Sequence, residues 1–178
     1  MKKYFSIWNI IGIIVVLIGS LFYIFSHQIT KTEIVNSEIV NDNSTKLKKV
    51  VLKLYFANKD ATGFIVEKRN ITVYDNDNLY QIAINELIKG PKQIGKPILS
   101  QKVPTPTVFI SERTAYVDLP SSYAKLGLGT RGETILIYGI ANTIFGQGSI
   151  DEIRFLVSGR PARTLGHISL VEPIRRSR

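Results

Sequence analysis

The sequence predicts an α+β domain in which two helices pack on one face of a mostly antiparallel or mixed sheet of about five strands, preceded by one transmembrane helix. Three observations support this prediction. Residues 7–25 carry no charge. Five later segments have the alternation or the β-branched content of strands with one buried face. Two further segments, 79–88 and 134–145, repeat apolar residues with the period of a helix.

The uncharged run 7–25 predicts an uncleaved transmembrane anchor. As a helix it would be about 28 Å long, close to the ~30 Å thickness of the hydrocarbon layer. Trp8 and Tyr23 lie near its ends, where amphipathic rings prefer the membrane interface. The run is longer than the apolar part of a signal peptide, and no small-x-small cleavage pattern follows it. Two lysines before the run and only one close behind it place residues 1–6 in the cytoplasm and the rest of the chain outside.

The remaining chain divides by composition. Residues 26–49 are rich in Thr, Asn, Ser, Glu and Lys and are interpreted as a linker, residues 50–174 as one domain, and residues 175–178 as a basic tail. The chain has no cysteine, which excludes a disulfide scaffold, a thiolate zinc site, a cysteine nucleophile and a lipid-modified cysteine anchor.

The strands are expected to form two hairpins and one closing strand. Segments 50–56 and 64–73 form a long hairpin, and segments 108–111 and 115–119 flank a short turn in the second. In that second hairpin Phe109 pairs with Tyr116 or with Asp118, depending on the register. The last clear strand covers residues 152–157, and a turn and a short closing segment follow it.

Both helices carry terminal signals. Asn78 can cap the first helix, and Gln81, three residues on, can reach back to it. Gly90 suits the left-handed position after that helix, and Pro91 prevents its continuation.

The second helix follows a capping box formed by Thr130 and Glu133 and ends at Gly146. Gly139 lies inside this helix, where glycine costs about 1 kcal/mol relative to alanine, so we expect a close backbone contact at that position.

The glycines at residues 127–132 match G-x-G-x-x-G, but a dinucleotide site needs them directly after a strand. Here a seven-residue segment separates them from the strand, so we expect no nucleotide and no other cofactor. A Ser/His/Asp set could be drawn from Ser121 or Ser122, His167 and Asp118, but no nucleophile elbow supports it. With one histidine in the domain, a metal site is not expected either.

The net charge of +9 favours anionic partners such as lipid head groups or wall polymers. Basic residues are not interleaved with aromatic residues in a stripe, so nucleic-acid binding is not expected.

Taken in order, these segments resemble the GerMN domain, the sporulation and spore germination domain of exported bacterial proteins. The resemblance covers about residues 50–173 and depends on "LKLYF", "FIVEKRNI", "AINELIKGP", the hairpin ending in "VDL", "ETILIYGIANTIF" and "FLVSG…LGH". The motif and structural residues on these segments are Glu67, Arg69, Gly90, Pro91, Asp118, Gly159, Gly166 and His167.

The resemblance implies an extracytoplasmic interaction domain with no known catalysis. The expected protein is a single-pass protein of the bacterial cell membrane whose C-terminal domain meets envelope proteins outside the cytoplasm. An alternative is a small binding module for an anionic ligand, such as a cell-wall polymer or glycan, using Arg160, Arg163 and His167. A third is a hydrolase that depends on His167.

Overall fold

The computed structural model describes residues 46–100 and 102–176. Its elements, in chain order, are β1 (Leu47–Ala57), β2 (Phe64–Tyr74), α2 (Leu79–Ile88), β3 (Thr107–Ser111), β4 (Thr114–Leu119), a short 3-10 helix (Ser121–Lys125), α3 (Gly129–Gly146), β5 (Glu152–Val157), β6 (Arg160–Pro161) and β7 (Ile174–Arg175).

The expected anchor 7–25 and the cytoplasmic segment 1–6 lie outside the described residues, as does most of the linker 26–49. Of the helices that are described, none is both long enough and apolar enough to cross a membrane.

The strands form two sheets. β1 and β2 pair antiparallel as a sheet of their own, and the second sheet has the order β3-β4-β5-β6, with β7 also pairing with β5. In the second sheet β4 and β5 are parallel and the other pairs are antiparallel. An α+β fold with two helices and a mixed sheet of about five strands is therefore confirmed. The sequence did not show that the first hairpin stays separate from this sheet.

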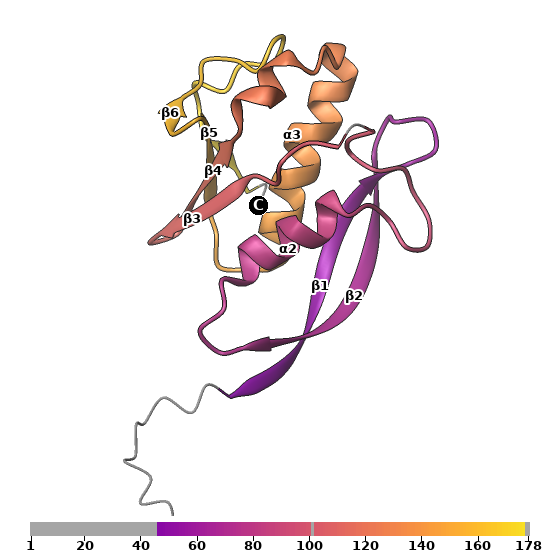
Figure 1. Cartoon of the computed structure of the whole chain (residues 1–178), viewed down its shortest axis with the longest axis vertical. Coiled ribbons are helices and arrows are strands. Elements are labelled where there is room, and N and C mark those ends of the chain that lie inside the picture. Colours follow the sequence, from indigo (N-terminus) through magenta and orange to yellow (C-terminus); the bar gives the residue numbers. More distant parts are fainter. Residues whose placement is uncertain (1–45, 101, 177–178) are drawn as a thin grey trace, which may run out of the picture. The chain divides into compact units, whose positions relative to one another are not determined.

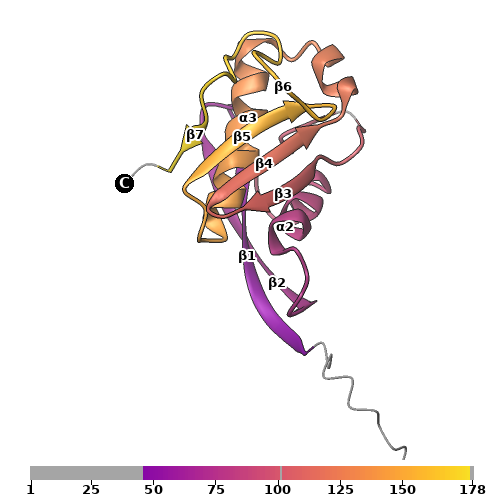
Figure 2. The same cartoon turned by 90° about the vertical axis from the view of Figure 1, so that its left-hand side faces the viewer.

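The helices lie between the two sheets (Figures 1 and 2), with the five-stranded sheet on one side and the β1–β2 hairpin on the other. One apolar cluster joins the inner faces of both sheets to the helices. Its fully buried members include Leu52 and Leu54 of β1, Val117 of β4, and Leu136 and Ile140 of α3. Because α3 is covered from both sides, its apolar residues extend almost around the helix, as expected for a central helix.

Small side chains let α3 approach the backbone of β1 closely. A Cβ at Gly139 would lie 3.4 Å from the carbonyl oxygen of Tyr55, so the expected close backbone contact at this glycine is present. The backbone N–H of Tyr55 donates to Thr143 Oγ1 at 3.0 Å, and Gln147 donates to the carbonyl of Lys53 at 2.9 Å. Side chains of α3 and the residue that follows it thus satisfy backbone groups along one edge of β1.

The first predicted cap is half confirmed. Asn78 accepts a hydrogen bond from the backbone N–H of Gln81 at 3.1 Å and caps α2. The Gln81 side chain does not reach back to Asn78. It accepts from the N–H of Val108 at 2.7 Å and donates to the carbonyl of Pro106 at 3.0 Å, so it fastens the outer edge of β3 to α2.

The second predicted cap is wrong. Helix α3 begins at Gly129 and has no side-chain cap, and the Glu133 carboxylate binds a distant loop instead of the helix start. Gly127 and Gly129 have φ values of 61° and 66°, in the left-handed region that glycine adopts without strain. These glycines therefore shape the bend between the 3-10 helix and α3.

The register of the second hairpin is settled by the structure. Phe109 pairs with Tyr116, and the turn between the strands places Glu112 at a φ of 54°. Gly90, with a φ of 89°, has the left-handed conformation expected after α2.

Candidate functional site

The eight residues singled out from the sequence lie in three places, and in each place a carboxylate binds backbone N–H groups of a loop or turn. The first place joins β2 to the end of α2, the second joins α3 to the loop after β6, and the third joins β4 to the turn after β5. In that order the residues are Glu67, Arg69, Gly90 and Pro91; Gly166 and His167; and Asp118 and Gly159.

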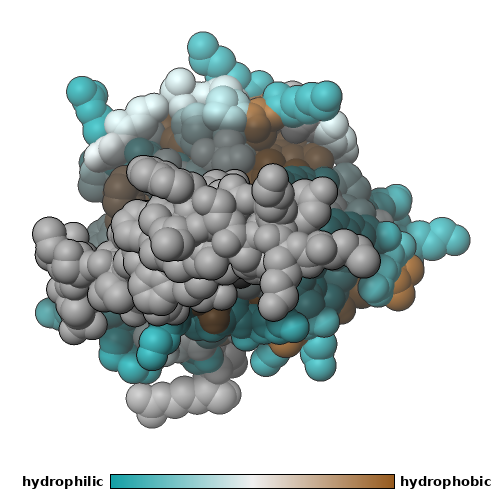
Figure 3. Space-filling model, turned by 60° about the horizontal axis from the view of Figure 1, so that its bottom comes forward, coloured by the Kyte–Doolittle hydropathy of each residue, from teal (hydrophilic) through white to brown (hydrophobic). Residues whose placement is uncertain are grey.

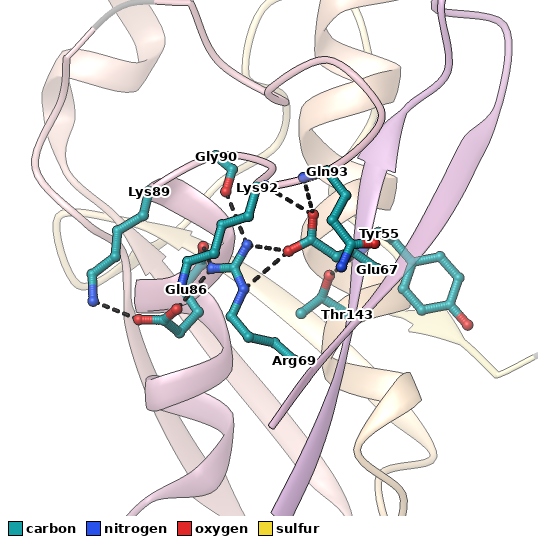
Figure 4. A network of polar contacts seen from close by, with 9 residues as sticks. All are labelled: Tyr55, Glu67, Arg69, Glu86, Lys89, Gly90, Lys92, Gln93 and Thr143. Carbon is teal, nitrogen blue, oxygen red and sulfur yellow. Dashed lines mark hydrogen bonds and ion pairs between the residues drawn. The ribbon is translucent and has the colours of Figure 1, made fainter. Parts of the chain in front are cut away.

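Arg69 is the centre of the first cluster (Figure 4). Its Nε donates to Glu67 Oε1 at 3.0 Å, and its Nη2 binds the same oxygen. Its Nη1 donates to Glu86 Oε2 at 2.7 Å, and Nη2 also donates to the carbonyl of Gly90 at 3.1 Å. The Arg69 side chain is only 6% exposed, so all three guanidinium nitrogens use acceptors within the protein.

The second oxygen of Glu67 fastens the loop after α2. Glu67 Oε2 accepts from the backbone N–H groups of Lys92 at 2.9 Å and Gln93 at 3.1 Å. Gly90 and Pro91 come just before these two residues and turn the chain away from the helix. Strand β2 and the C-terminal end of α2 are therefore held together by one buried ionic cluster.

The cluster is charged at neutral pH. Burial alone would raise the pKa of Glu67, but hydrogen bonds from Arg69 and from two backbone N–H groups outweigh it and lower the pKa. Burial also opposes ionisation of Glu86, and hydrogen bonds from Lys89 and Arg69 outweigh it there. The pKa of Arg69 is raised, because bonds to Glu86 and Glu67 outweigh its burial. Removing one partner of such a buried pair is costly, because it leaves the other charge buried without compensation.

Glu133 organises the second place. Its carboxylate is buried, and its Oε2 accepts from the backbone N–H groups of His167 at 2.7 Å and Ile168 at 3.0 Å. Its Oε1 lies 2.9 Å from Nδ1 of the His167 ring. Burial would raise the pKa of Glu133, but the bonds to His167 and Ile168 outweigh it and lower the pKa. His167 is thus placed as a loop residue that binds a carboxylate, with its side chain 56% exposed.

Asp118 forms the third place. Its Oδ1 accepts from the backbone N–H of Gly159 at 2.8 Å. Ser158 and Gly159 have φ values of 49° and 74°, so the turn after β5 contains two successive left-handed residues. Asp118 and Gly159 are therefore brought together. Within residues 102–176 Asp118 forms no hydrogen bond or ion pair with His167, so the Ser/His/Asp set considered from the sequence is not formed.

Sequence reasoning missed two residues of these clusters, Glu86 and Glu133. Glu86 lies on α2 three residues before Lys89, with which it forms an ion pair, and this spacing was the available signal. Glu133 was assigned to a helix cap, and nothing in the local sequence indicates a partner 34 residues away.

The three places hold loops, and their geometry offers no convergent reactive groups. Across residues 46–100 and 102–176, no group of three His, Cys, Asp or Glu residues could hold a metal ion. The role of the eight residues as functional residues stays a prediction.

The described part of the chain also has exposed surfaces away from these three places. The outer face of the β1–β2 hairpin carries exposed apolar side chains, and a groove of about 630 Å³ on the outer face of the second sheet is lined by Tyr116, Leu156, Arg154 and Arg163 among others. Figure 3 shows mainly hydrophilic residues on the visible coloured surface, with smaller hydrophobic areas between them. The exposed apolar residues of the hairpin are Leu47, Val51, Val66 and Tyr74.

Solved structures similar to this chain include three bacterial ones. A proposed lipoprotein from Clostridium perfringens is 28% identical, with a TM-score of 0.46 over 72% of this chain and 88% of that one. The tandem GerMN domains of the sporulation protein GerM from Bacillus subtilis are 17% identical, with a TM-score of 0.48 over 76% of this chain and 46% of that one. The first GerMN domain of the same protein is 18% identical, with a TM-score of 0.50 over 71% of this chain and 98% of that one.

No curated protein matches the sequence. The model of the family named Germane, described as "Sporulation and spore germination", matches residues 53–163 as a single copy. This match spans more than half of the chain and includes β2, both helices and β3–β5. The chain therefore belongs to the Germane family, the family of GerMN domains.

Proposed function

We propose that this chain is a membrane-anchored assembly protein of spore formation or germination, whose domain at residues 50–174 binds envelope proteins outside the cytoplasm. Membership in the Germane family, which has no known catalytic role, supports a non-catalytic task in these processes. The uncharged run 7–25 supports the anchor, and the lysines before it support a C-terminal domain outside the cytoplasm.

The observation that carries the interaction role is the outer face of the β1–β2 hairpin. Leu47 and Tyr74 pair across the two strands and are 63% and 49% exposed, and Val51 and Val66 are 55% and 45% exposed. These apolar side chains alternate along the face with Lys49, Lys53 and Lys68, so the face offers a partner both apolar contact and positive charge. The helices pack on the opposite face of this hairpin. Within the described part of the chain no other element packs on the outer face, so a partner can reach it.

The location can be tested with a single introduced cysteine, because the chain has none of its own. In the variant Asn76→Cys the thiol lies on an exposed turn after β2. We expect a membrane-impermeant maleimide to label this variant in intact cells. Labelling only after the membrane is broken would contradict the proposed orientation.

The interaction can be tested by placing a photo-cross-linking residue at Val51, with Val171 as the matched control. Both side chains are more than half exposed, but Val171 lies beside the groove of the second sheet and not on the hairpin. We expect a defined protein adduct from position 51 and a weaker or different one from position 171. A chain that forms no adduct from position 51 at native abundance would contradict the assembly role of this face.

The groove favours a second candidate function, a binding module for an anionic ligand such as a cell-wall polymer or glycan. Arg154 and Arg163 line it together with Tyr116 and Leu156. Glu152 also lines the groove and pairs with Arg154 at 3.2 Å, so Arg163 supplies the positive charge that has no acidic partner among the described residues. His167 binds Glu133 and does not line this groove, so it is not part of the proposal. Binding of purified wall polymer that weakens steeply with salt and is lost in Arg163→Gln would support this function.

A further inference from the structure

Strand β2 has one edge that pairs with β1 and one that does not. Ala57 exchanges backbone hydrogen bonds with Lys96, and Tyr55 donates its N–H to Thr143, so these residues of β1 direct their backbone groups away from β2. Their partners across the hairpin, Phe64 and Val66, therefore belong to non-hydrogen-bonded pairs.

Hydrogen-bonded and non-hydrogen-bonded pairs alternate along an antiparallel hairpin, so every second residue of β2 directs its N–H and C=O toward the open edge. Tyr74 agrees with this, because its N–H leaves the hairpin and donates to Asp77 Oδ2 at 2.7 Å. No hydrogen bond from another described residue satisfies the edge-facing backbone groups between these ends. The residues concerned are Val66, Lys68, Asn70 and Thr72. Figure 1 shows β2 at the outer side of the hairpin, with no strand beyond it.

The exposed face beside this edge carries three lysines between its apolar side chains. Lys53 lies directly opposite Lys68 in a non-hydrogen-bonded pair, the closer of the two antiparallel pair types. Like charges placed in this way destabilise a hairpin. Lys49 lies on the same face, and among the described residues none of these three lysines forms a salt bridge. No acidic residue of β1 or β2 shares this outer face.

We propose that the open edge of β2 binds an extended acidic segment of a partner protein, which adds a strand to the hairpin. Backbone groups of Val66, Lys68, Asn70 and Thr72 form the new ladder, and a carboxylate of the added strand meets Lys68, with Lys53 behind it on β1. The inference deepens the assembly role proposed above and rests on it, because it names the chemistry of the partner.

Charge favours an acidic partner over a second copy of this chain. Pairing of β2 with another β2 would bring Lys68 of both copies, each with Lys53 opposite it, onto one face, and like charges across neighbouring strands are unfavourable. Lysines at an open edge commonly prevent self-association of strands. Here the same lysines repel another copy of the chain and attract a strand that carries carboxylates. The lysines therefore select one kind of partner over the other.

The test uses the full chain in an uncharged detergent and a short peptide with glutamate at three alternate positions and threonine or valine between them. We expect amide exchange to slow at least about tenfold at the four edge-facing N–H groups of β2. The N–H groups of Glu67, Arg69 and Ile71, which already face β1, should keep their rates. This alternation along one strand distinguishes strand addition from general binding or from a change in stability.

Two control peptides and two variants sharpen the test. A peptide with lysine in place of glutamate and a peptide with N-methylated backbone amides should both bind at least about tenfold more weakly. Lys68→Glu should weaken binding of the glutamate peptide by a similar factor, whereas Lys125→Glu, an exposed lysine on the 3-10 helix, should not.

Three results would overturn the proposal. The first is no protection of the edge amides at about 1 mM peptide. The second is equal binding of the lysine peptide and the glutamate peptide. The third is equal binding of the N-methylated glutamate peptide, because this would indicate that the domain attracts any polyanion. Each rejects the open edge of β2 as a docking site. None rejects the assembly role itself, which the cross-linking from position 51 decides separately.

Discussion

Gly166 lies directly against the carboxylate of Glu133, so that a Cβ at position 166 would clash with Glu133 Oε1. Gly166 is not among the glycines with a positive φ, so its backbone conformation does not require glycine. The short distance to the Glu133 carboxylate does require glycine, because this carboxylate cannot move away without losing its hydrogen bonds from the N–H groups of His167 and Ile168.

We therefore expect Gly166→Ala to destabilise the domain by about 1–3 kcal/mol, the usual cost of leaving buried polar groups without partners. Urea unfolding measures this change. Gly63→Ala is the matched control, since a Cβ there would meet its nearest atom at an ordinary 3.6 Å. Equal stabilities of the two variants would contradict the proposed contact.

Replacing Arg69 by methionine should cost about 3–5 kcal/mol, because it leaves the buried carboxylates of Glu67 and Glu86 without their cation. Lys89→Met removes the other partner of Glu86, but Lys89 is 66% exposed, and an exposed pair contributes about 1 kcal/mol or less. The double variant Glu67→Gln with Arg69→Met should cost less than the sum of its two single changes. Additive costs would show that the two groups do not act as a pair.

The stability of the domain should fall as the pH falls below the ordinary glutamate pKa of 4.5. The folded-state pKa values of Glu67 and Glu133 are lowered, so in this range the unfolded chain binds more protons than the folded one. Their contribution is complete above pH 4.5 and is lost as the pH falls through the folded-state values. Urea midpoints between pH 7 and pH 3 measure the loss.

The glutamate variants test the source of this pH dependence. Glu133→Gln should lower the stability at neutral pH and flatten its fall below pH 4.5, because a titrating group with a shifted pKa is gone. A variant with an unchanged slope would assign the acid sensitivity to other carboxylates.

Gly139→Ala should destabilise the domain although alanine is the better helix former by about 1 kcal/mol. The added Cβ would lie 2.8 Å from Ile98 Cγ2 and 3.4 Å from the carbonyl oxygen of Tyr55, and overpacking of this kind costs about 1–3 kcal/mol. Thermal unfolding measures the net effect. The substitution Ile98→Ala should lower the stability of the Gly139→Ala variant less than that of the wild type, since it removes the atom with which the new Cβ clashes. A Gly139→Ala variant more stable than the wild type would show that α3 does not pack this tightly.

The sequence predicted best what short segments decide. The alternation in β5 and the Asn78 signal before α2 depend on neighbours a few residues away, and both elements lie where the patterns put them. The capping box at Thr130 and Glu133 had an equally good local pattern and was wrong. A buried position beside His167 and Ile168 offers that carboxylate stronger partners than the helix start does.

By itself the sequence determined the family, the α+β class and the order of the five longer strands and helices α2 and α3, because each depends on local periodicity and on the spacing of motifs along the chain. The 3-10 helix and the two-residue strands β6 and β7 are too short to leave such a period. Only the tertiary structure decided that β1 and β2 form a separate sheet on the far side of α3. It also decided that Glu67 and Glu133 hold loops 25 and 34 residues away. The physical reason is that an apolar face or a carboxylate specifies the kind of partner it needs, whereas packing of the whole chain selects which partner comes within reach.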